Sequence, residues 1–203
     1  MTIFRYAMKR TVKTPVDALM LLALPVAIVF VTRETWLPLP MGLQFYGMLL
    51  LFISSKICKI MMTDRESKVT LRISASPVTQ LRYLSENLAA FGLILTVING
   101  IVVLTASVYY DIALGILGRL FILYSAFSIA AIGLAIAWYA LFSNSEAAYS
   151  VLGGLYAAMA MIGGMFWPYE LMPDPVVRII RILPTYWYSL GLRQISFHSP
   201  KAF

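Results

Sequence analysis

Ionisable and nucleophilic side chains are too few and too scattered in this 203-residue sequence to form a catalytic centre. There is one histidine, His198, and one cysteine, Cys58, whereas a metal site needs several such ligands close together. The apolar segments contain no paired carboxylates, Ser/His pair or histidine cluster, which an enzyme acting inside a membrane would need. No Walker A phosphate-binding pattern occurs either. We therefore expect no catalytic residue, no metal and no cofactor bound by this chain.

Two amides in or beside the apolar segments, Asn99 and Gln44, are the polar side chains with the clearest potential for function. Polar groups inside lipid are costly and often mark a substrate route. They also commonly hydrogen-bond a neighbouring helix. Helix pairing is the favoured interpretation for Asn99, and a place on a substrate route stays open for both residues.

The composition predicts an integral membrane protein. Hydrophobic residues make up 61% of the chain and charged residues 12%, with a mean hydropathy of +0.82, whereas soluble domains are about half apolar and a quarter charged. The net charge of +7 does not indicate nucleic-acid binding, because the basic residues lie between apolar runs, where membrane orientation accounts for them. Five apolar segments are predicted to span the membrane: residues 16–32, 45–62, 87–109, 116–142 and 147–166.

Lysine and arginine predict the orientation of these segments. The N-terminal arm at 1–14 and the link at 63–86 are the most basic parts of the chain, and the positive-inside rule places both in the cytoplasm. We expect a multi-pass protein of the cell membrane, bacterial in kind, with a cytoplasmic N-terminus. The pattern of the arm predicts an amphipathic interfacial helix, or else a frayed basic tail. In the helix, the side chains facing lipid would be Ile3, Phe4, Ala7 and Met8.

The cytoplasmic link has a charged start followed by sparse apolar positions over residues 64–78. A short amphipathic helix here is either a solvated linker on the headgroups or a plug that docks into a partner and transmits its motion. Glu146, on the same side, can cap the helix of the fifth segment. The residues expected to make the docking contact are Arg65, Glu66, Lys68, Leu71, Arg72 and Pro77.

Glycines, aromatics and prolines interrupt the chain after the fifth segment. Proline excludes a continuous helix, and broken backbone at membrane depth must be buried in protein or line a wet cavity. We expect a membrane-surface element or external re-entrant helices at one mouth of a transport route, built on Gly164, Phe166, Pro168, Glu170, Pro173 and Pro184. An anchoring aromatic belt is predicted at the same interface, formed by Trp36, Tyr109, Tyr110, Trp167, Tyr186, Trp187 and Tyr188.

Together, the cytoplasmic and external stretches resemble the permease family of ABC-2 type transporters, over essentially the whole chain. The family's first cytoplasmic loop reads roughly E-x-G-T-L-x-R-L-x-A-T-P-V, and this sequence matches it at Glu66, Arg72, Ala75, Pro77 and Val78. The external segment reads roughly G-x-F-x-P-x-E-x-M-P, then L-P-x-x-Y and a closing L-R. It is matched by Gly164, Phe166, Pro168, Glu170, Met172, Pro173, Leu183, Pro184, Leu192 and Arg193, with Trp187 in place of the tyrosine. Lys68 and Val69 depart from the pattern, because they stand where Gly-Thr is usual.

The resemblance implies a transport subunit and not an enzyme. Its expected task is export of a drug, antibiotic or lipid-like molecule from the cytoplasm or inner leaflet, as in efflux and antibiotic resistance. The implied partners are a second permease copy or a related permease, membrane lipid, and a cytoplasmic ABC ATPase that binds ATP and Mg. Polysaccharide export and a non-transporting or immunity membrane protein are the alternatives.

The resemblance also predicts the extent of the domain. The family has a sixth span after the closing Leu-Arg, and residues 194–203 cannot supply one. We therefore expect a single all-α ABC-2 type transmembrane domain over residues 1–203. It would have five visible spans where the family has six, lacking the last one.

Overall fold

The computed structural model describes residues 2–11, 15–30, 40–69, 79–110, 112, 114–166 and 172–197. Within these ranges every regular element is a helix, so the all-α prediction is confirmed for the described residues. The helices are α1 (Thr2–Thr11), α2 (Pro15–Val29), α3 (Met41–Glu66), α5 (Gln80–Tyr110), α6 (Leu114–Ala140), α7 (Ser145–Ile162), α8 (Asp174–Ile180) and α9 (Pro184–Phe197).

All five segments predicted as spans contain a helix, from α2 to α7. Three of these helices are long and apolar enough to cross a membrane by themselves, namely α3, α5 and α6. Helix α2 has 15 residues and contains Pro25, and α7 has 18 residues with Glu146 in its first turn. Length and composition therefore support a multi-pass membrane protein, with the two remaining segments shorter or less apolar than the others.

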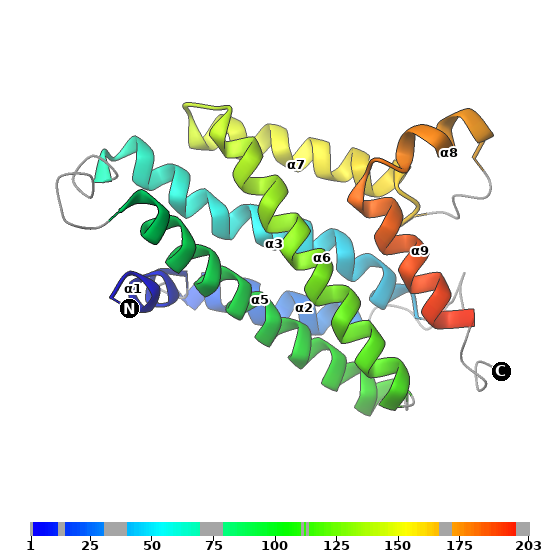
Figure 1. Ribbon diagram of the computed structural model, residues 1–203. Coiled ribbons are helices and arrows are strands. Elements are labelled where there is room, and N and C mark those ends of the chain that lie inside the picture. The colour runs from blue at the N-terminus through cyan, green and yellow to red at the C-terminus, as the bar shows by residue number, and fades with distance from the viewer. Residues whose placement is uncertain are drawn as a thin grey trace.

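Helices α2, α3, α5, α6 and α7 lie side by side along the length of the molecule, and successive ones run in alternating directions (Figure 1). Helix α3 lies at the centre, where it packs on α6, α7, α2, α9 and α5. Helix α1 lies at one end of the bundle and α8 with α9 at the other (Figure 1). The two ends therefore gather different segments of the chain.

The interior is filled by aromatic and aliphatic side chains from the long helices, such as the fully buried Tyr46, Phe91 and Tyr124. Large apolar side chains also cover the outside: Leu104 is 68% exposed and Val108 89%. An apolar surface of this kind is expected of a protein whose solvent is lipid.

The structure corrects the prediction of what the apolar face of the N-terminal arm contacts. Residues 2–11 do form a helix, but Ala7 is 3% exposed, and Phe4 and Met8 pack against the buried core. Helix α1 lies on α5. The apolar face of α1 is therefore directed into the bundle and not into lipid, because the N-terminal part of α5 offers it a protein surface.

Candidate functional site

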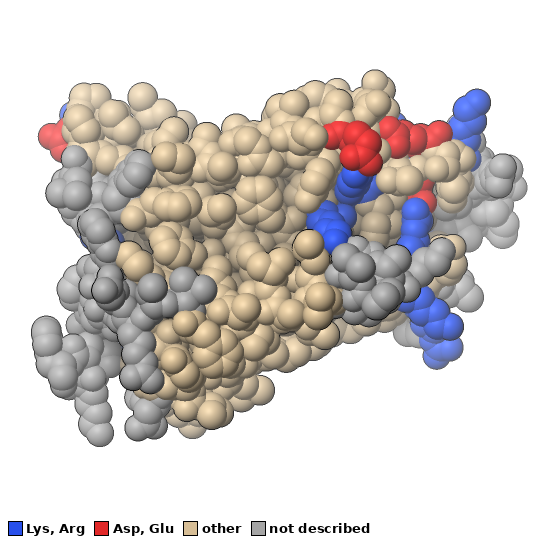
Figure 2. Space-filling model, turned by 180° about the vertical axis from the view of Figure 1, so that it is seen from behind, with Lys and Arg blue, Asp and Glu red and all other residues tan. Residues whose placement is uncertain are grey.

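Charged side chains concentrate at the end of the bundle that holds α1 (Figure 2). We call this the charged end, and it comprises residues 4–10, 56–68, 82–86 and 144–149. Here α3 finishes, α5 and α7 begin, and α1 lies on α5. The segment predicted to dock a partner leaves the bundle from this end.

Asp64 is the most buried carboxylate of the charged end, with a side chain that is 7% exposed. It pairs with Arg10 of α1 and accepts a hydrogen bond from the Tyr83 hydroxyl of α5 at 2.7 Å. A buried charge is tolerated only when it is paired and hydrogen-bonded, and Asp64 has both kinds of partner. It therefore ties three helices, α1, α3 and α5, at one point.

Glu86 forms a second link between α1 and α5. Its carboxylate accepts hydrogen bonds from Arg82 Nε at 2.9 Å and from the backbone N–H of Phe4 at 3.0 Å. The Phe4 amide belongs to the first turn of α1, whose N–H groups have no partner within the helix. Arg82 first, and then this amide, lower the pKa of Glu86 to about 2. Glu86 lies just before the apolar segment at 87–109 and stays ionised at neutral pH.

Glu66, the last residue of α3, caps the start of α7. Its carboxylate accepts hydrogen bonds from Ser145 Oγ at 2.7 Å and from the Ser145 backbone N–H at 2.5 Å. These two bonds hold the pKa of Glu66 below its ordinary value. Asn144 is the residue that precedes the helix, and its side chain accepts from the Ala147 N–H at 2.9 Å. An anion at this position also suits the positive end of the α7 dipole.

Lys59 forms a second bridge from α3 to α7. Its ammonium lies 2.6 Å from the carboxylate of Glu146 and 4.9 Å from the centroid of the Tyr149 ring. The prediction that Glu146 caps α7 was therefore wrong in its residue, because Asn144 and Glu66 accept from the first amides of α7 and Glu146 pairs with Lys59. Within the described ranges, no group of three or more His, Cys, Asp or Glu residues could hold a metal ion.

The predicted docking residues divide into two groups. Arg65, Glu66 and Lys68 are exposed at the end of α3, and Glu66 is already bonded to Ser145. Lys68 has a backbone φ of 56°, a left-handed conformation that favours glycine after a helix. Glycine is also the usual residue here in the motif that this stretch resembles. The other predicted contacts, Leu71, Arg72 and Pro77, lie outside the described residues.

The opposite end of the bundle, which we call the α9 end, comprises residues 40–47, 159–166 and 172–195. Thr185 Oγ1 donates to the Met159 carbonyl at 2.9 Å, and Ser189 Oγ to the Gly163 carbonyl at 2.9 Å. A Cβ at Gly163 would lie 2.0 Å from Thr185 Oγ1. Glycine is therefore required for α9 to fit against the end of α7, whose last carbonyls need partners.

Tyr188 inserts from α9 into the core. It is 1% exposed, and its hydroxyl donates to the Leu43 carbonyl at 3.0 Å. Its ring lies 4.6 Å from that of Phe127, and a Cβ at Gly47 would lie 2.4 Å from it. The prediction that Tyr188 belongs to an interfacial belt was therefore wrong. The neighbouring Trp187 has an exposed side chain, 58%, as a belt residue would. Belt residues Trp36 and Trp167 lie outside the described part of the chain.

The predicted external segment is only partly described. Gly164 has a φ of 84°, which favours glycine, and Phe166 packs on Phe45 with ring centroids 5.2 Å apart. Pro173 precedes α8 and Pro184 is the first residue of α9, where a proline costs no hydrogen bond. Pro168 and Glu170 lie outside the described residues.

Comparison with known proteins identifies the family. The model of the family described as "ABC-2 family transporter protein" matches residues 39–201, from the start of α3 through α9. The chain belongs to the ABC-2 transporter family. It is also 29% identical over 135 residues to "Putative transport permease YvfS" of Bacillus subtilis (strain 168), a match that covers 64% of this chain and 54% of that protein. The chain thus spans about half the length of the curated relative it matches.

In this ABC-2 protein, Asn99 links three helices deep in the bundle. It is fully buried; its Oδ1 accepts from the Tyr46 hydroxyl at 2.7 Å and its Nδ2 donates to Ser128 Oγ at 3.1 Å. These bonds join α5 to α3 and α6, as expected of an amide that pairs helices. Gln44 is half-buried, two residues before Tyr46, and its backbone carbonyl lies 3.4 Å from the Tyr188 hydroxyl.

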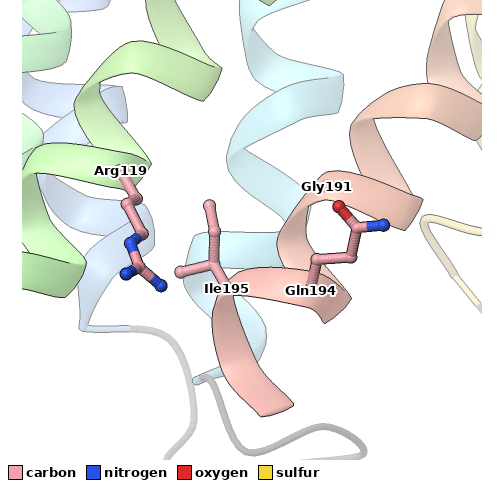
Figure 3. Close-up of a pocket in the computed structure, with 4 residues that line it drawn as sticks. All are labelled: Arg119, Gly191, Gln194 and Ile195. Atoms are coloured by element: carbon pink, nitrogen blue, oxygen red, sulfur yellow. The ribbon is translucent and has the colours of Figure 1, made fainter. Parts of the chain in front are cut away.

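A cavity of about 500 Å³ lies at the α9 end, between the first turns of α6 and the last turns of α9 (Figure 3). Arg119 and Ile195 approach each other across it, while the amide of Gln194 points away from Arg119 (Figure 3). Arg119 is the single cation among its lining residues, which are Arg119, Gly191, Gln194 and Ile195.

Sequence reasoning did not find the residues that hold the charged end together: Lys59, Asp64, Tyr83, Glu86 and Ser145. Each is an ordinary charged or polar residue in the first or last two turns of a helix, where a solvent-exposed role is the usual expectation. Only the pairing of helix ends distant in sequence makes them partners; Glu66 and Ser145 are 79 residues apart. One local signal was available, the Arg82–Glu86 spacing of four residues on one helix.

Proposed function

We propose that this chain is the membrane-spanning permease subunit of an ATP-driven ABC-2 exporter. Its substrate would be a drug, an antibiotic or a lipid-like molecule, moved out of the cytoplasm or inner leaflet. The observation that carries the proposal is the family match across residues 39–201. ATP and Mg would be bound by a separate cytoplasmic ATPase, and this chain would pair with a second permease.

The proposed topology has five crossings, by α2, α3, α5, α6 and α7. The alternating directions of these helices support it, because each successive helix returns to the opposite end of the bundle (Figure 1). The charged end would face the cytoplasm, in agreement with the positive-inside rule. Helices α8 and α9 would then lie at the external mouth, with α1 at the cytoplasmic boundary.

The charged end supplies a route for coupling. A partner that moves residues 64–78 would pull on the end of α3, and Glu66 would pass that motion to α7 through Ser145. Asp64 would pass it to α1 through Arg10. We propose that substrate leaves between α2, α3 and α7, the helices that this movement would separate.

Affinity purification in mild detergent, with mass spectrometry of the co-purifying proteins, tests the proposal. A stoichiometric ATP-binding protein is the expected companion. The double variant R65E/R72E should recover less of it, whereas R178E/R181E, the matched double charge reversal at the other end, should not. Glu66 is left intact because it caps α7. Equal recovery with R65E/R72E would contradict docking at this loop, and absence of any ATPase would contradict the exporter.

Cysteine labelling tests the orientation. Cys58 is buried, so background labelling of the parent chain should be low. A D174C variant should react with an impermeant maleimide on intact cells, and S67C only after lysis. The reverse pattern would show that the charged end faces outward.

A further inference from the structure

Tyr156 of α7 is a buried tyrosine whose hydroxyl has no hydrogen-bond partner within the described residues. The residue is 1% exposed, and buried tyrosines usually place their hydroxyl on an acceptor. Four other core tyrosines bond through their hydroxyls to a side chain or a backbone carbonyl, namely Tyr46, Tyr124, Tyr139 and Tyr188. The Tyr156 hydroxyl is therefore an exception that calls for an explanation.

The other buried polar atom without a partner in the described part of the chain is Ser125 Oγ on α6. A serine hydroxyl can rotate to the backbone carbonyl four residues earlier, so a small side-chain movement satisfies it. A tyrosine hydroxyl stands at the far end of a rigid ring and cannot reach its own backbone. Tyr156 therefore needs an acceptor from another helix or from a bound molecule.

Tyr156 lies in the seam between α3 and α7. Its ring meets the ring of Phe52 of α3 edge-on, with centroids 6.3 Å apart and an interplanar angle of 88°. Three residues earlier on α7, a Cβ at Gly153 would lie 3.6 Å from the Phe52 ring. The middle of the seam thus combines aromatic packing with one unused hydrogen-bond donor.

This seam is one that the proposed export would open. At the charged end it is held by the pair of Lys59 and Glu146, a contact that a partner moving the end of α3 would disturb. Separation of α3 from α7 would uncover the Tyr156 hydroxyl and the Phe52 ring together. Polar groups inside the membrane are costly and often mark a substrate route.

The surroundings favour an uncharged ligand. An ion entering an apolar seam loses more hydration energy than one neutral hydrogen bond returns, whereas a carbonyl or ether oxygen loses little. We propose that Tyr156 donates a hydrogen bond to a neutral oxygen of the exported molecule, while Phe52 contacts an aromatic or apolar part of it. The inference rests on the proposed exporter and narrows its substrate to uncharged amphipathic molecules.

Thermal unfolding in detergent tests whether the hydroxyl is unused in the protein alone. Y156F should leave the unfolding midpoint unchanged or raise it, because no hydrogen bond is lost. Y124F, which loses a bond to the Leu43 carbonyl, is the matched control and should lower the midpoint. An equal loss in the two variants would show that an ordered water or another group already satisfies Tyr156, and would overturn the proposal.

Binding of two matched probes tests the ligand. Fluorenone and fluorene share one ring skeleton, and only fluorenone carries a carbonyl acceptor. Quenching of tryptophan fluorescence in the purified permease should show about fivefold tighter binding of fluorenone, the effect of one neutral hydrogen bond. Y156F should lose this preference and keep the affinity for fluorene. Y149F, on the same helix at the charged end, should retain the preference.

The outcomes separate this site from the exporter itself. Equal or absent binding of the two probes by the parent, or a carbonyl preference that persists in Y156F, would overturn the site even if an ATPase co-purifies. A preference that Y156F removes, in a chain with a co-purifying ATPase, would support both proposals. The same preference without any ATPase would keep the binding site and contradict export.

Discussion

The two ends of this ABC-2 protein are held together by different interactions. At the charged end, α1, α3, α5 and α7 meet through carboxylates that accept from Arg10, Tyr83, Ser145 and Lys59. At the α9 end, neutral hydroxyls of Thr185, Ser189 and Tyr188 donate to backbone carbonyls of α7 and α3.

The two kinds of contact differ in how strongly they depend on salt and pH. Charge-assisted contacts near water weaken when salt or pH changes, so the charged end can exchange partners. Neutral hydrogen bonds to carbonyls buried among aromatic rings have no such sensitivity. This difference favours the charged end as the place where the proposed partner couples, and the α9 end as the part that holds a fixed shape.

The largest expected effect tests the fixed end. Y188A removes a fully buried ring and should destabilise the protein by about 3–5 kcal/mol, whereas Y188F loses only a hydrogen bond, worth about 1 kcal/mol. Thermal unfolding in detergent measures both. Y6A, at a position 67% exposed, is the control for loss of a tyrosine. A Y188A loss no greater than that of Y6A would contradict the anchoring role of α9.

The next effect tests the charged end. D64N removes the charge that pairs with Arg10 and should cost about 2 kcal/mol, the usual contribution of a hydrogen bond to a charged group. D174N on the exposed start of α8 is the matched control and should be nearly neutral. Because the Asp64 side chain is only 7% exposed, high salt should screen the pair little and leave most of the loss in D64N in place. Equal unfolding midpoints for the two variants would show that the Asp64 cluster does not hold α1.

A substitution at Lys68 should stabilise the charged end. The left-handed backbone at this position costs an L-residue about 1 kcal/mol, so K68G should raise the stability by a similar amount. K68A removes the same charged side chain without relieving the backbone and should give no gain. A gain shared by both variants would mean that the charge, and not the conformation, is unfavourable.

The smallest effect is a pH dependence that belongs to the charged end. The folded pKa of Glu86 is about 2, below its ordinary value of 4.5, so its contribution is fully present above pH 4.5. That contribution is lost as the pH falls from 4.5 toward 2, because protonation removes the bonds from Arg82 and Phe4. Unfolding midpoints between pH 6 and pH 3 should therefore fall less in E86Q than in the parent. Parallel curves would assign the acid sensitivity to other groups.

Much of the helical framework could be predicted from sequence because it depends on local signals. The apolar run at 116–142 became α6 with both ends displaced by two residues, whereas the run at 87–109 became the later part of α5, which already begins at Gln80. Whether a side chain faces the protein core or the lipid could not be predicted in the same way. Ala7 and Tyr188 were expected at lipid or interface, and both are buried, because an apolar face packs equally well on lipid and on another helix.

From sequence alone, it could be predicted that the protein lies in a membrane, approximately where its helices end, and that it resembles ABC-2 permeases. Apolar run length and proline positions are properties of short stretches of sequence. They set the length and ends of a helix without any contact to another helix. Only the tertiary structure decided that Glu66 caps α7, that Asp64 joins α1 to α5 and that Tyr188 closes the α9 end. These contacts link residues from 19 to 145 positions apart. Their partners are therefore chosen by the packing of whole helices and not by the local sequence around either residue.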